Sequence, residues 1–533
     1  MILSRQAVVD FQTREFDSFL WMKGLTERQL HAELCRMTVQ PYFKTKPWLH
    51  QLVCFFIGVH HPEFLFLLDM GLGKSKIVLD LVTHARRTKR LRRALVTVPR
   101  MINMDSWRDD ILLHSDLEPW DVNVSDTEEK WERLADPRGD LTVIDYQGLH
   151  LALSEKRPAK KGKHTLVPDE KRIRRIKKLY NFVAADESHK LTNTDSLWFA
   201  LMRRLTAEAE FTYATTGTLF GRDLEDIWPQ FFLVDKGETF GVNRGLFRAS
   251  FFTAKPNPWG RGEKYEYDGR NDAKLNQMLQ HRSLRYDESE VLDLPTRVPV
   301  VEQFSMSQEQ REHYTRALEG LINATGNLEE MKGQWVRMRQ IISGYLVWDD
   351  EHGRHTLRFK ENHKLDGLER LLDEMGPRAK AVVCYDYTET GQMIVDRVRE
   401  MGIGHEWFYG GTKDKTASRD RFMTDPACRV FVMNSSAGGT GNDGLQKAAR
   451  YMFLYETPTS PVERKQTIKR IHRPGQTMRT FIYDLVMRGS LDPGILMGIQ
   501  ENVDTYDSVV NGRRRPGRGF FLQDMPQGAK VVI

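Results

Sequence analysis

FLFLLDMGLGKSKIVLDLVTHARR, residues 64–87, joins an apolar run, a glycine-containing turn and a helix-like pattern without interruption. The apolar run 64–69 shows no polar alternation, which is typical of a strand covered on both faces of a parallel sheet. Gly71 and Gly73 leave backbone N–H groups accessible at the start of the helix, where an anion is favoured. This order predicts an α/β fold with a phosphate site at the carboxyl end of the strand.

Further apolar runs of this kind recur along the chain, and helix-like stretches separate them. Their positions are ALVTVP (94–99), LTVID (141–145), NFVAAD (181–186), FTYATT (211–216), AVVCYD (381–386), VFVMN (430–434), YMFLYE (451–456) and TFIYDL (480–485). The runs form two groups, with a more helical and loop-rich region between them. Alternating β and α segments in two groups predict two α/β lobes, each a mostly parallel sheet flanked by helices.

Composition sets broad limits on the class of protein. A chain of 533 residues is too long for one hydrophobic core, so several domains are expected. The net charge of +6 permits a polyanionic partner without demonstrating one. The four cysteines lie far apart, which disfavours a zinc site and favours reduced thiols.

No apolar run is long enough to span a membrane, and the N-terminal sequence lacks the apolar core of a signal peptide. We therefore expect a soluble, cytoplasmic protein of a bacterium or of a virus-infected cell, or a nuclear protein if the source is eukaryotic.

DMGLGKSK, residues 69–76, has the residue types of a phosphate-binding loop. Lys74 is expected to reach the β- and γ-phosphates of a nucleotide, and Ser75 to hold Mg²⁺. The strict pattern has a further glycine five residues before Gly73, where this chain has Leu68. The motif by itself leaves open a glycine-rich helix start that binds no ligand.

Asp186 and Glu187 follow the apolar run 181–186, at the end of a strand where an open parallel sheet presents catalytic groups. Asp186 is expected to hold Mg²⁺ through water, and Glu187 to orient and deprotonate the attacking water. The plain alternative is a pair of acids stabilised by the dipole of a helix start. The phosphate loop earlier in the chain favours the catalytic interpretation.

QTIKRIHRPGQ, residues 466–476, carries Arg470 and Arg473 with no carboxylate between them. Continued as a helix, this spacing places both guanidinium groups on one face. Arginines paired in this way typically bind a carboxylate or a phosphate. We expect their target to be the phosphates held by the upstream lobe. For His472, a packed and hydrogen-bonded side chain is at least as good an interpretation as a functional one.

With these residues in place, the chain resembles the superfamily-two helicase motors of the Swi/Snf-like group, which are double-stranded DNA translocases. The resemblance runs from about residue 45 to about residue 500, with the motifs in family order. The blocks that carry it are HQ (50–51), LDMGLGKS (68–75), LVTVPRMINMDSW (95–107), LTVIDYQGL (141–149), DESH (186–189), TTGT (215–218), a bridge at 293–372, SSAGGTGNDGLQKA (435–448, motif V) and QTIKRIHRPGQ (466–476, motif VI). Two departures stand out: DESH is the variant of annealing-helicase-like members, and LDMGLGKS replaces the family's DEMGLGKT.

The resemblance implies ATP and Mg²⁺ as cofactors and DNA, duplex or branched, as partner. The residues that it implies for hydrolysis are Lys74, Glu187 and two arginine fingers, Arg470 and Arg473. The residues that it implies for ATP binding are Gln51, Gly71, Gly73, Lys74, Ser75 and Gly441, with Ser75 and Asp186 for the metal. The residues that it implies for coupling ATP to DNA are His189, Thr216, Gly217, Thr218 and Gln476. The residues that it implies for DNA phosphates are Arg100, Asn103, Gln147, Ser435, Ser436 and Thr440.

The resemblance also implies a domain order with two RecA-like lobes and helical insertions. The expected segments are an N-terminal extension (1–45), lobe 1 (46–235), a linking and helical insertion region (236–375), lobe 2 (376–500) and a C-terminal tail (501–533). Within lobe 1 the densely basic insert 155–178 either extends the DNA footprint or is a solvated surface loop, and both remain open.

The function expected from these motifs is an ATP-dependent translocase that moves along double-stranded or branched DNA. A strand-separating or annealing helicase at forks and recombination intermediates is the first alternative. A DNA-binding scaffold with a vestigial ATPase is the second, and the intact Lys74, Asp186, Glu187, Arg470 and Arg473 argue against it. A motor subunit of a restriction system would need a partner for cutting, because the chain shows no nuclease motif.

Overall fold

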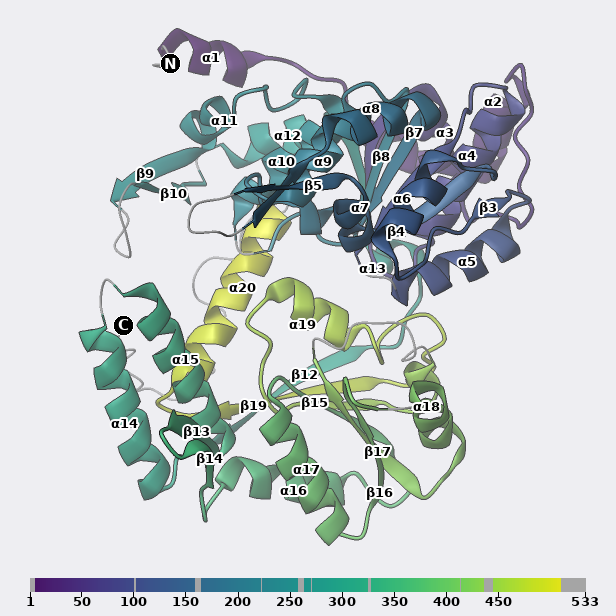
Figure 1. Cartoon of the computed structure of the whole chain (residues 1–533). Coiled ribbons are helices and arrows are strands. Elements are labelled where there is room, and N and C mark those ends of the chain that lie inside the picture. The colour runs from purple at the N-terminus through teal and green to yellow at the C-terminus, as the bar shows by residue number, and fades with distance from the viewer. Residues whose placement is uncertain are drawn as a thin grey trace. The chain divides into compact units, whose positions relative to one another are not determined.

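The chain folds as two compact units, each with its own sheet and core (Figure 1). The computed structural model describes residues 5–99, 102–158, 164–221, 223–256, 263–269, 271–324, 327–412, 414–435 and 444–509. The first unit consists mainly of residues 1–254 and 265–292, and the second mainly of residues 293–508. The expected linking region 236–375 is thus divided between the two units.

The first unit is built around a sheet that has, within the described residues, the strand order β11-β1-β8-β7-β2-β4-β3. Every neighbouring pair in it is parallel. The strands are β1 (Glu63–Leu68), β2 (Ala94–Val98), β3 (Pro119–Trp120), β4 (Leu141–Asp145), β7 (Phe182–Asp186), β8 (Phe211–Thr216) and β11 (Ser283–Tyr286). Five of these match the predicted apolar runs, which confirms the parallel α/β interpretation.

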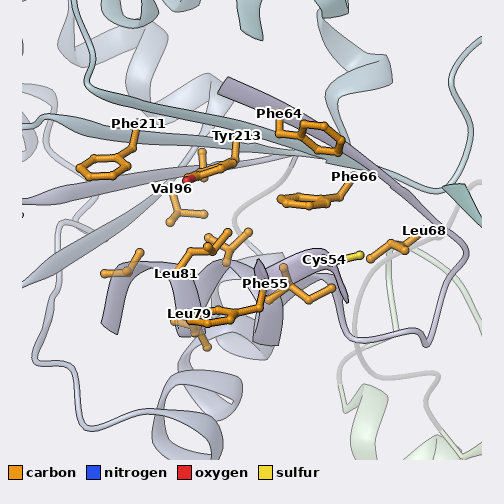
Figure 2. Close-up of a cluster of buried hydrophobic side chains, with 14 of the residues drawn as sticks. Cys54, Phe55, Phe64, Phe66, Leu68, Leu79, Leu81, Val96, Phe211 and Tyr213 are labelled. Carbon is orange, nitrogen blue, oxygen red and sulfur yellow. The ribbon is translucent and has the colours of Figure 1, made fainter. Parts of the chain in front are cut away.

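Helices cover both faces of this sheet (Figure 1). The helices of this unit are α1 (Arg5–Thr13), α2 (Glu27–Cys35), α3 (Leu49–His60), α4 (Lys74–Arg87), α5 (Ile102–His114), α6 (Thr127–Ala135), α7 (Tyr146–Ala152), α8 (Glu170–Leu179), α9 (Leu197–Thr206), α10 (Ile227–Asp235), α11 (Arg244–Phe251), α12 (Asp272–Arg282) and α13 (Glu288–Val291). Figure 2 shows Phe55 of α3 and Leu79 and Leu81 of α4 packed below Phe66 and Tyr213 of the sheet. This cluster holds α4, and with it the phosphate loop, against β1.

The second unit contains a sheet in the order β12-β19-β18-β15-β17-β16, again with parallel neighbours among the described residues. The strands are β12 (Arg297–Phe304), β15 (Ala381–Tyr385), β16 (Gly404–Phe408), β17 (Cys428–Asn434), β18 (Tyr451–Leu454) and β19 (Thr480–Met487). The helices are α14 (Gln308–Asn323), α15 (Leu328–Ser343), α16 (His363–Glu374), α17 (Thr388–Glu400), α18 (Lys415–Thr424), α19 (Pro461–Ile468) and α20 (Leu491–Val509). Alternate side chains of the strands enter two separate cores, one on each face.

Two edge strands do not stand out in the sequence. β11 pairs with β1 at an edge of the first sheet, and β12 pairs with β19 at an edge of the second. β11 is largely buried but short, and it includes Ser283 and Arg285, whereas β12 is only partly buried, so neither shows the continuous apolar run of a central parallel strand. β12 accordingly alternates between exposed and partly buried positions.

The N-terminal extension packs as part of the first unit. Phe11 of α1 is buried, and its ring lies 6.4 Å from that of Phe251 in α11. Leu30 and Leu34 of α2 belong to the same core cluster as the sheet. The described part of this segment thus contains helices that pack with the first unit.

The basic insert contains an antiparallel hairpin, β5 (Ser154–Pro158) and β6 (His164–Pro168), followed by α8. Ile173 and Ile176 of α8 are buried, so this helix is a packed element of the unit. Arg172 of this insert lies 2.7 Å from Glu128 of α6, so one positive charge of the insert is paired with a carboxylate of the same unit.

At the C-terminal end, α20 continues to Val509, beyond the expected start of the tail at residue 501. The arginine-rich stretch 511–521 lies outside the described residues. Within the described part of the chain, no helix has both the length and the apolar character needed to cross a bilayer.

Two further hairpins are formed by β9 (Phe252–Pro256) with β10 (Glu263–Tyr267), and by β13 (Tyr345–Asp350) with β14 (Gly353–Arg358).

Candidate nucleotide site

The turn between β1 and α4 adopts the backbone that its glycines allow. Gly71 and Gly73 have φ angles of 86° and 76°, which side chains of other residues rarely tolerate. A Cβ on Gly73 would lie 2.2 Å from Nε2 of Gln51. That amide donates a hydrogen bond to the carbonyl of Leu72 at 3.2 Å, so α3 is tied to the loop. Gln51 therefore lies beside the phosphate loop, where adenine recognition was expected.

Lys74 begins α4 and points back toward the end of β1. Its Nζ donates to the carbonyl of Leu68 at 3.3 Å and lies 3.3 Å from Oε1 of Glu187. Burial by itself would lower the pKa of Lys74, but the carboxylates of Glu187, Asp186 and Asp69 outweigh it and raise that pKa. The lysine is held fully charged next to the acids of the DESH segment.

Asp186, at the end of β7, is held by donors from three segments. Thr215 Oγ1 donates to Oδ1 at 2.7 Å, the backbone N–H of Glu187 donates to the same oxygen at 2.9 Å, and Trp107 Nε1 donates to Oδ2 at 3.1 Å. Burial raises the pKa of Asp186, the charge of Glu187 adds to this, and Lys74 opposes it. The carboxylate is thus fixed in orientation as well as in position.

Glu187 has a φ of 49°, a left-handed conformation that is strained for a residue with a side chain. Its Oε2 lies 3.2 Å from Nδ1 of His189. Burial would raise the pKa of Glu187, but Lys74 and His189 lower it below its usual range. The strained backbone turns this carboxylate toward the phosphate loop.

The TTGT segment closes the site from β8. His189 Nδ1 lies 3.1 Å from Thr216 Oγ1, and Thr216 Oγ1 donates to the carbonyl of Thr218 at 2.9 Å. A Cβ on Gly217 would lie 3.3 Å from the carbonyl of Leu68 and 3.7 Å from Nζ of Lys74. A glycine at this position lets the loop after β8 approach the lysine. Of the residues expected to couple ATP to DNA, His189 therefore contacts Glu187 directly, and Thr216 contacts His189.

Three residues that position Asp186 were not singled out from the sequence. They are Thr215, Trp107 and Tyr146, whose hydroxyl donates to the backbone carbonyl of Asp186 at 2.8 Å. Each lies within a motif block that the resemblance covers. The sequence signal that could have identified them is a hydroxyl or an indole N–H within a segment whose other residues are apolar.

The donor set suits Mg²⁺ that binds together with a nucleotide. Among the described residues, no three His, Cys, Asp or Glu side chains converge on a point that could hold a metal ion. Mg²⁺ keeps several waters and is usually held by one or two protein oxygens plus phosphates. Ser75, the second residue of α4, and the oriented carboxylate of Asp186 fit that requirement.

A family model described as the SNF2-related domain matches residues 47–347, more than half of the chain. The chain belongs to the SNF2-related family. The match includes the phosphate loop, DESH and TTGT, the three segments that meet in the geometry above. The Swi/Snf-like resemblance noted from the sequence is thereby confirmed.

Curated relatives of this SNF2-related chain are longer proteins. The ISWI chromatin-remodeling complex ATPase ISW1 of Saccharomyces cerevisiae is 22% identical over 508 residues, covering 88% of this chain and 41% of that protein. A DNA repair and recombination protein RAD54-like of Drosophila pseudoobscura pseudoobscura is 28% identical over 174 residues, covering 31% of this chain and 22% of that protein. This chain spans less than half the length of either.

A solved structure described as the Sulfolobus solfataricus SWI2/SNF2 ATPase core in complex with dsDNA is 18% identical to this SNF2-related chain. The alignment covers 89% of this chain and 96% of that one, with a TM-score of 0.39.

In the second unit of this SNF2-related chain, the two arginines of QTIKRIHRPGQ do not lie on a helix. α19 ends at Ile468, and Arg470 and Arg473 follow in turns. The expectation of one shared helical face is therefore wrong. Directly after the helix, the backbone N–H groups of Arg470 and Ile471 donate to carbonyls three residues back, as in a tight turn.

Gln476 and His472 are packed within the second unit. Gln476 Nε2 donates to the carbonyls of Ala449 and Ile471 at 3.0 and 2.9 Å, so its side chain fixes the turn. His472 Nδ1 lies 3.2 Å from Thr480 Oγ1. Burial lowers the pKa of His472 to about 4, and Arg297 and Lys469 act in the same direction. The histidine is thus partly buried and hydrogen-bonded, as the first of the two interpretations expected.

Of the residues expected to contact DNA, the structure places two. Gln147 is exposed on α7, and Ser435 is buried directly after β17. The remaining expected residues outside the described part are Arg100, Ser436, Thr440 and the motif V glycine Gly441, together with the side chain of Asn103.

Proposed function

We propose that this chain is a DNA-dependent ATPase that couples ATP hydrolysis to movement along double-stranded or branched DNA. The observation that carries the proposal is the contact of Lys74 with Glu187, beside an Asp186 whose carboxylate is held by Thr215 and Trp107. A phosphate-binding lysine, a metal-binding acid and an acid for water activation are the parts that phosphoryl transfer requires. The names of SNF2-related relatives as chromatin-remodeling ATPase and as repair and recombination protein support the same class.

Lys74 binds the β- and γ-phosphates, and these compete with Glu187 for its charge. A Glu187 side chain released from Lys74 accepts a proton from the attacking water or orients that water. Asp186 and Ser75 hold Mg²⁺, which neutralises phosphate charge when it is bound. Gln51, whose amide already contacts the loop, reads the adenine.

Arg470 and Arg473 stabilise negative charge that develops on the transferred phosphoryl group. Arginine suits this role because its guanidinium stays charged and binds phosphate oxygens through two donors. Removing such a group costs orders of magnitude in rate while nucleotide binding persists.

DNA is held through its backbone, without base recognition. The residues proposed for these contacts are Arg100, Asn103, Gln147, Ser435, Ser436 and Thr440. On the basic insert, α8 adds an exposed row at positions one helical turn apart, formed by Lys171, Arg174, Arg175 and Lys178. Their positive charge suits phosphates, so this row extends the footprint.

The test is the ATPase rate of the purified chain with single-stranded, duplex and forked DNA and with RNA. We expect duplex and forked DNA to stimulate hydrolysis, and Lys74→Ala to abolish it. Lys190→Ala, an exposed lysine next to the DESH segment, is the matched control and should leave the rate within about twofold. No stimulation by DNA, or an unchanged rate in Lys74→Ala, would overturn the proposal.

Strand displacement separates translocation from strand separation. A pure duplex translocase displaces the third strand of a triplex but does not separate a duplex, whereas a fork-acting helicase separates it. The DESH variant keeps that alternative in view, and a positive duplex-separation assay would favour it.

A further inference from the structure

A network of charged side chains lies at the carboxyl end of the second sheet and includes a residue of the bridge region 293–372, to which no role has been given so far. It consists of Arg339 of α15, Asp386 after β15 and Glu456 after β18. Arg339 is 5% exposed and Glu456 is 2% exposed. Arg339 Nη2 lies 2.9 Å from Asp386 Oδ2 and donates to the carbonyl of Thr457 at 3.0 Å. The guanidinium thus bridges the ends of two neighbouring segments.

Glu456 accepts hydrogen bonds from four donors. The backbone N–H groups of Asp386 and Tyr387 donate to Oε2 at 2.6 and 3.1 Å, and Thr390 Oγ1 donates to Oε1 at 2.7 Å. Ser343 Oγ of α15 also donates to Oε1. Burial raises the pKa of Glu456, the charge of Asp386 adds to this, and Arg339 opposes it. A buried carboxylate in this position is stable only with such complete pairing.

The network leads to the segment that begins motif V. Asn434 Nδ2 at the end of β17 donates to the backbone carbonyl of Asp386 at 2.8 Å. The next residue, Ser435, donates its backbone N–H to the carbonyl of Tyr385 at 2.7 Å. Asp386 is therefore fixed to Arg339 by its side chain and, by its backbone carbonyl, to Asn434, the residue directly before motif V.

The network also leads to α19, the helix that precedes Arg470. Thr457, whose carbonyl binds Arg339, donates through Oγ1 to Asp484 Oδ1 at 3.1 Å. Asp484 Oδ2 accepts from Arg464 Nη2 of α19 at 2.6 Å. One guanidinium on α15 thus supports both the start of motif V and the helix that leads into motif VI.

We propose that Arg339 is a positioning residue for ATP hydrolysis, which sets the placement of motifs V and VI from helix α15. The proposal rests on the ATPase function proposed above. It assigns a role to the bridge region between the lobes' motifs, since α15 is far from motifs V and VI in sequence. Packing in this site is dense, so a small displacement at Arg339 moves the attached segments as a body.

Two variants test the proposal. Arg339→Met combined with Asp386→Asn removes both charges together and leaves no buried charge of this pair uncompensated. Arg339→Lys keeps the charge, but its ammonium lacks the planar set of donors with which the guanidinium binds both Asp386 and the carbonyl of Thr457. We expect kcat of DNA-stimulated hydrolysis to fall about tenfold or more in the double variant, with affinity for an ATP analogue and for duplex DNA unchanged. Arg339→Lys should lie between the double variant and the unaltered chain.

The matched control is the buried pair of Lys364 and Asp492 in the same unit, 3.0 Å apart and 1% and 3% exposed in their side chains. Lys364→Met combined with Asp492→Asn should lower Tm but leave kcat within about twofold, because neither side chain contacts the described residues of motif V or motif VI. An equal loss of kcat in this control would show a general effect of lobe stability and would overturn the proposal.

Unaltered kcat in the folded Arg339 double variant would also overturn it. If the double variant fails to fold, the Arg339→Lys variant is used in its place. An Arg339→Lys variant with the kcat and the Tm of the unaltered chain would then overturn the proposal. Absence of DNA-stimulated hydrolysis in the unaltered chain would overturn the proposed function and this inference together. Equal DNA-stimulated hydrolysis in the unaltered chain and in the Arg339 variant would overturn the inference alone.

Discussion

Lys74 Nζ and Glu187 Oε1 lie 3.3 Å apart, so the lysine of the phosphate loop contacts the acid expected to activate water. Lys74 is the first residue of α4, after the loop that follows β1, and Glu187 directly follows β7; β8 lies between β1 and β7 in the sheet. Because the two charges attract, this contact lowers the pKa of Glu187 and raises the pKa of Lys74. We expect a phosphate bound by Lys74 to weaken this contact and to return the pKa of the glutamate toward the range that proton transfer needs.

Glu187→Gln should abolish hydrolysis while ATP still binds. Glutamine keeps the shape but neither the charge nor the basicity, so we expect kcat to fall about a hundredfold or more. Affinity for nucleotide should stay or increase, because Lys74 loses its competing anion. Measuring Kd by fluorescence titration beside the ATPase rate checks both. A parallel loss of binding would mean that Glu187 holds the site together rather than acting in the reaction.

Thr215→Val should disturb the Asp186 carboxylate. The substitution is nearly isosteric and removes the donor at 2.7 Å, so stability should fall by about 1–2 kcal/mol and the Mg²⁺ concentration for half-maximal activity should rise. Thr212→Val on the same strand is the matched control, because Thr212 Oγ1 is buried without a hydrogen-bond partner. Equal Mg²⁺ dependence in the two variants would argue against a metal-orienting role for Thr215.

Arg470→Ala and Arg473→Ala should each reduce hydrolysis by about tenfold or more, with nucleotide and DNA binding largely preserved. Arg479→Ala, an exposed arginine shortly after the motif, serves as the control and should change neither. Rates are compared at saturating ATP and duplex DNA. A variant that hydrolyses ATP like the unaltered chain would show that its arginine is structural.

His472 should make the second unit less stable at acid pH. Its pKa is lowered to about 4 in the folded chain, whereas an unfolded histidine titrates near its ordinary value of 6.5. The unfolded state binds more protons between these values, so the contribution is fully present above pH 6.5 and is lost as the pH falls toward 4.

Urea unfolding of the unaltered chain and of His472→Asn, at pH 7 and pH 5, measures this contribution. We expect a smaller pH dependence in the variant. His352→Asn, an exposed histidine in the same unit, is the control and should leave the dependence unchanged. A variant with the full dependence of the unaltered chain would place the acid sensitivity elsewhere.

Local pattern was enough to identify the central strands and the phosphate loop. Strands β1, β7 and β8 are buried on both faces, so each is a continuous apolar run that a sequence displays directly. The glycines of the loop are visible for a similar reason, because their positive φ angles restrict the residue type. The motif order then placed Lys74, Asp186 and Glu187 at strand ends.

Tertiary structure decided what spacing could not. Arg470 and Arg473 have helical spacing, yet α19 ends at Ile468, and local hydrogen bonds tighten into turns there. Trp107 holds Asp186, and Arg339 holds Asp386, across long stretches of sequence. Such partners share no periodicity with their targets, since only the order of strands in the sheet and the packing of helices on it bring them together. The sequence by itself therefore determined the α/β architecture and the residues at the strand ends, whereas the folded chain decided which side chains orient them.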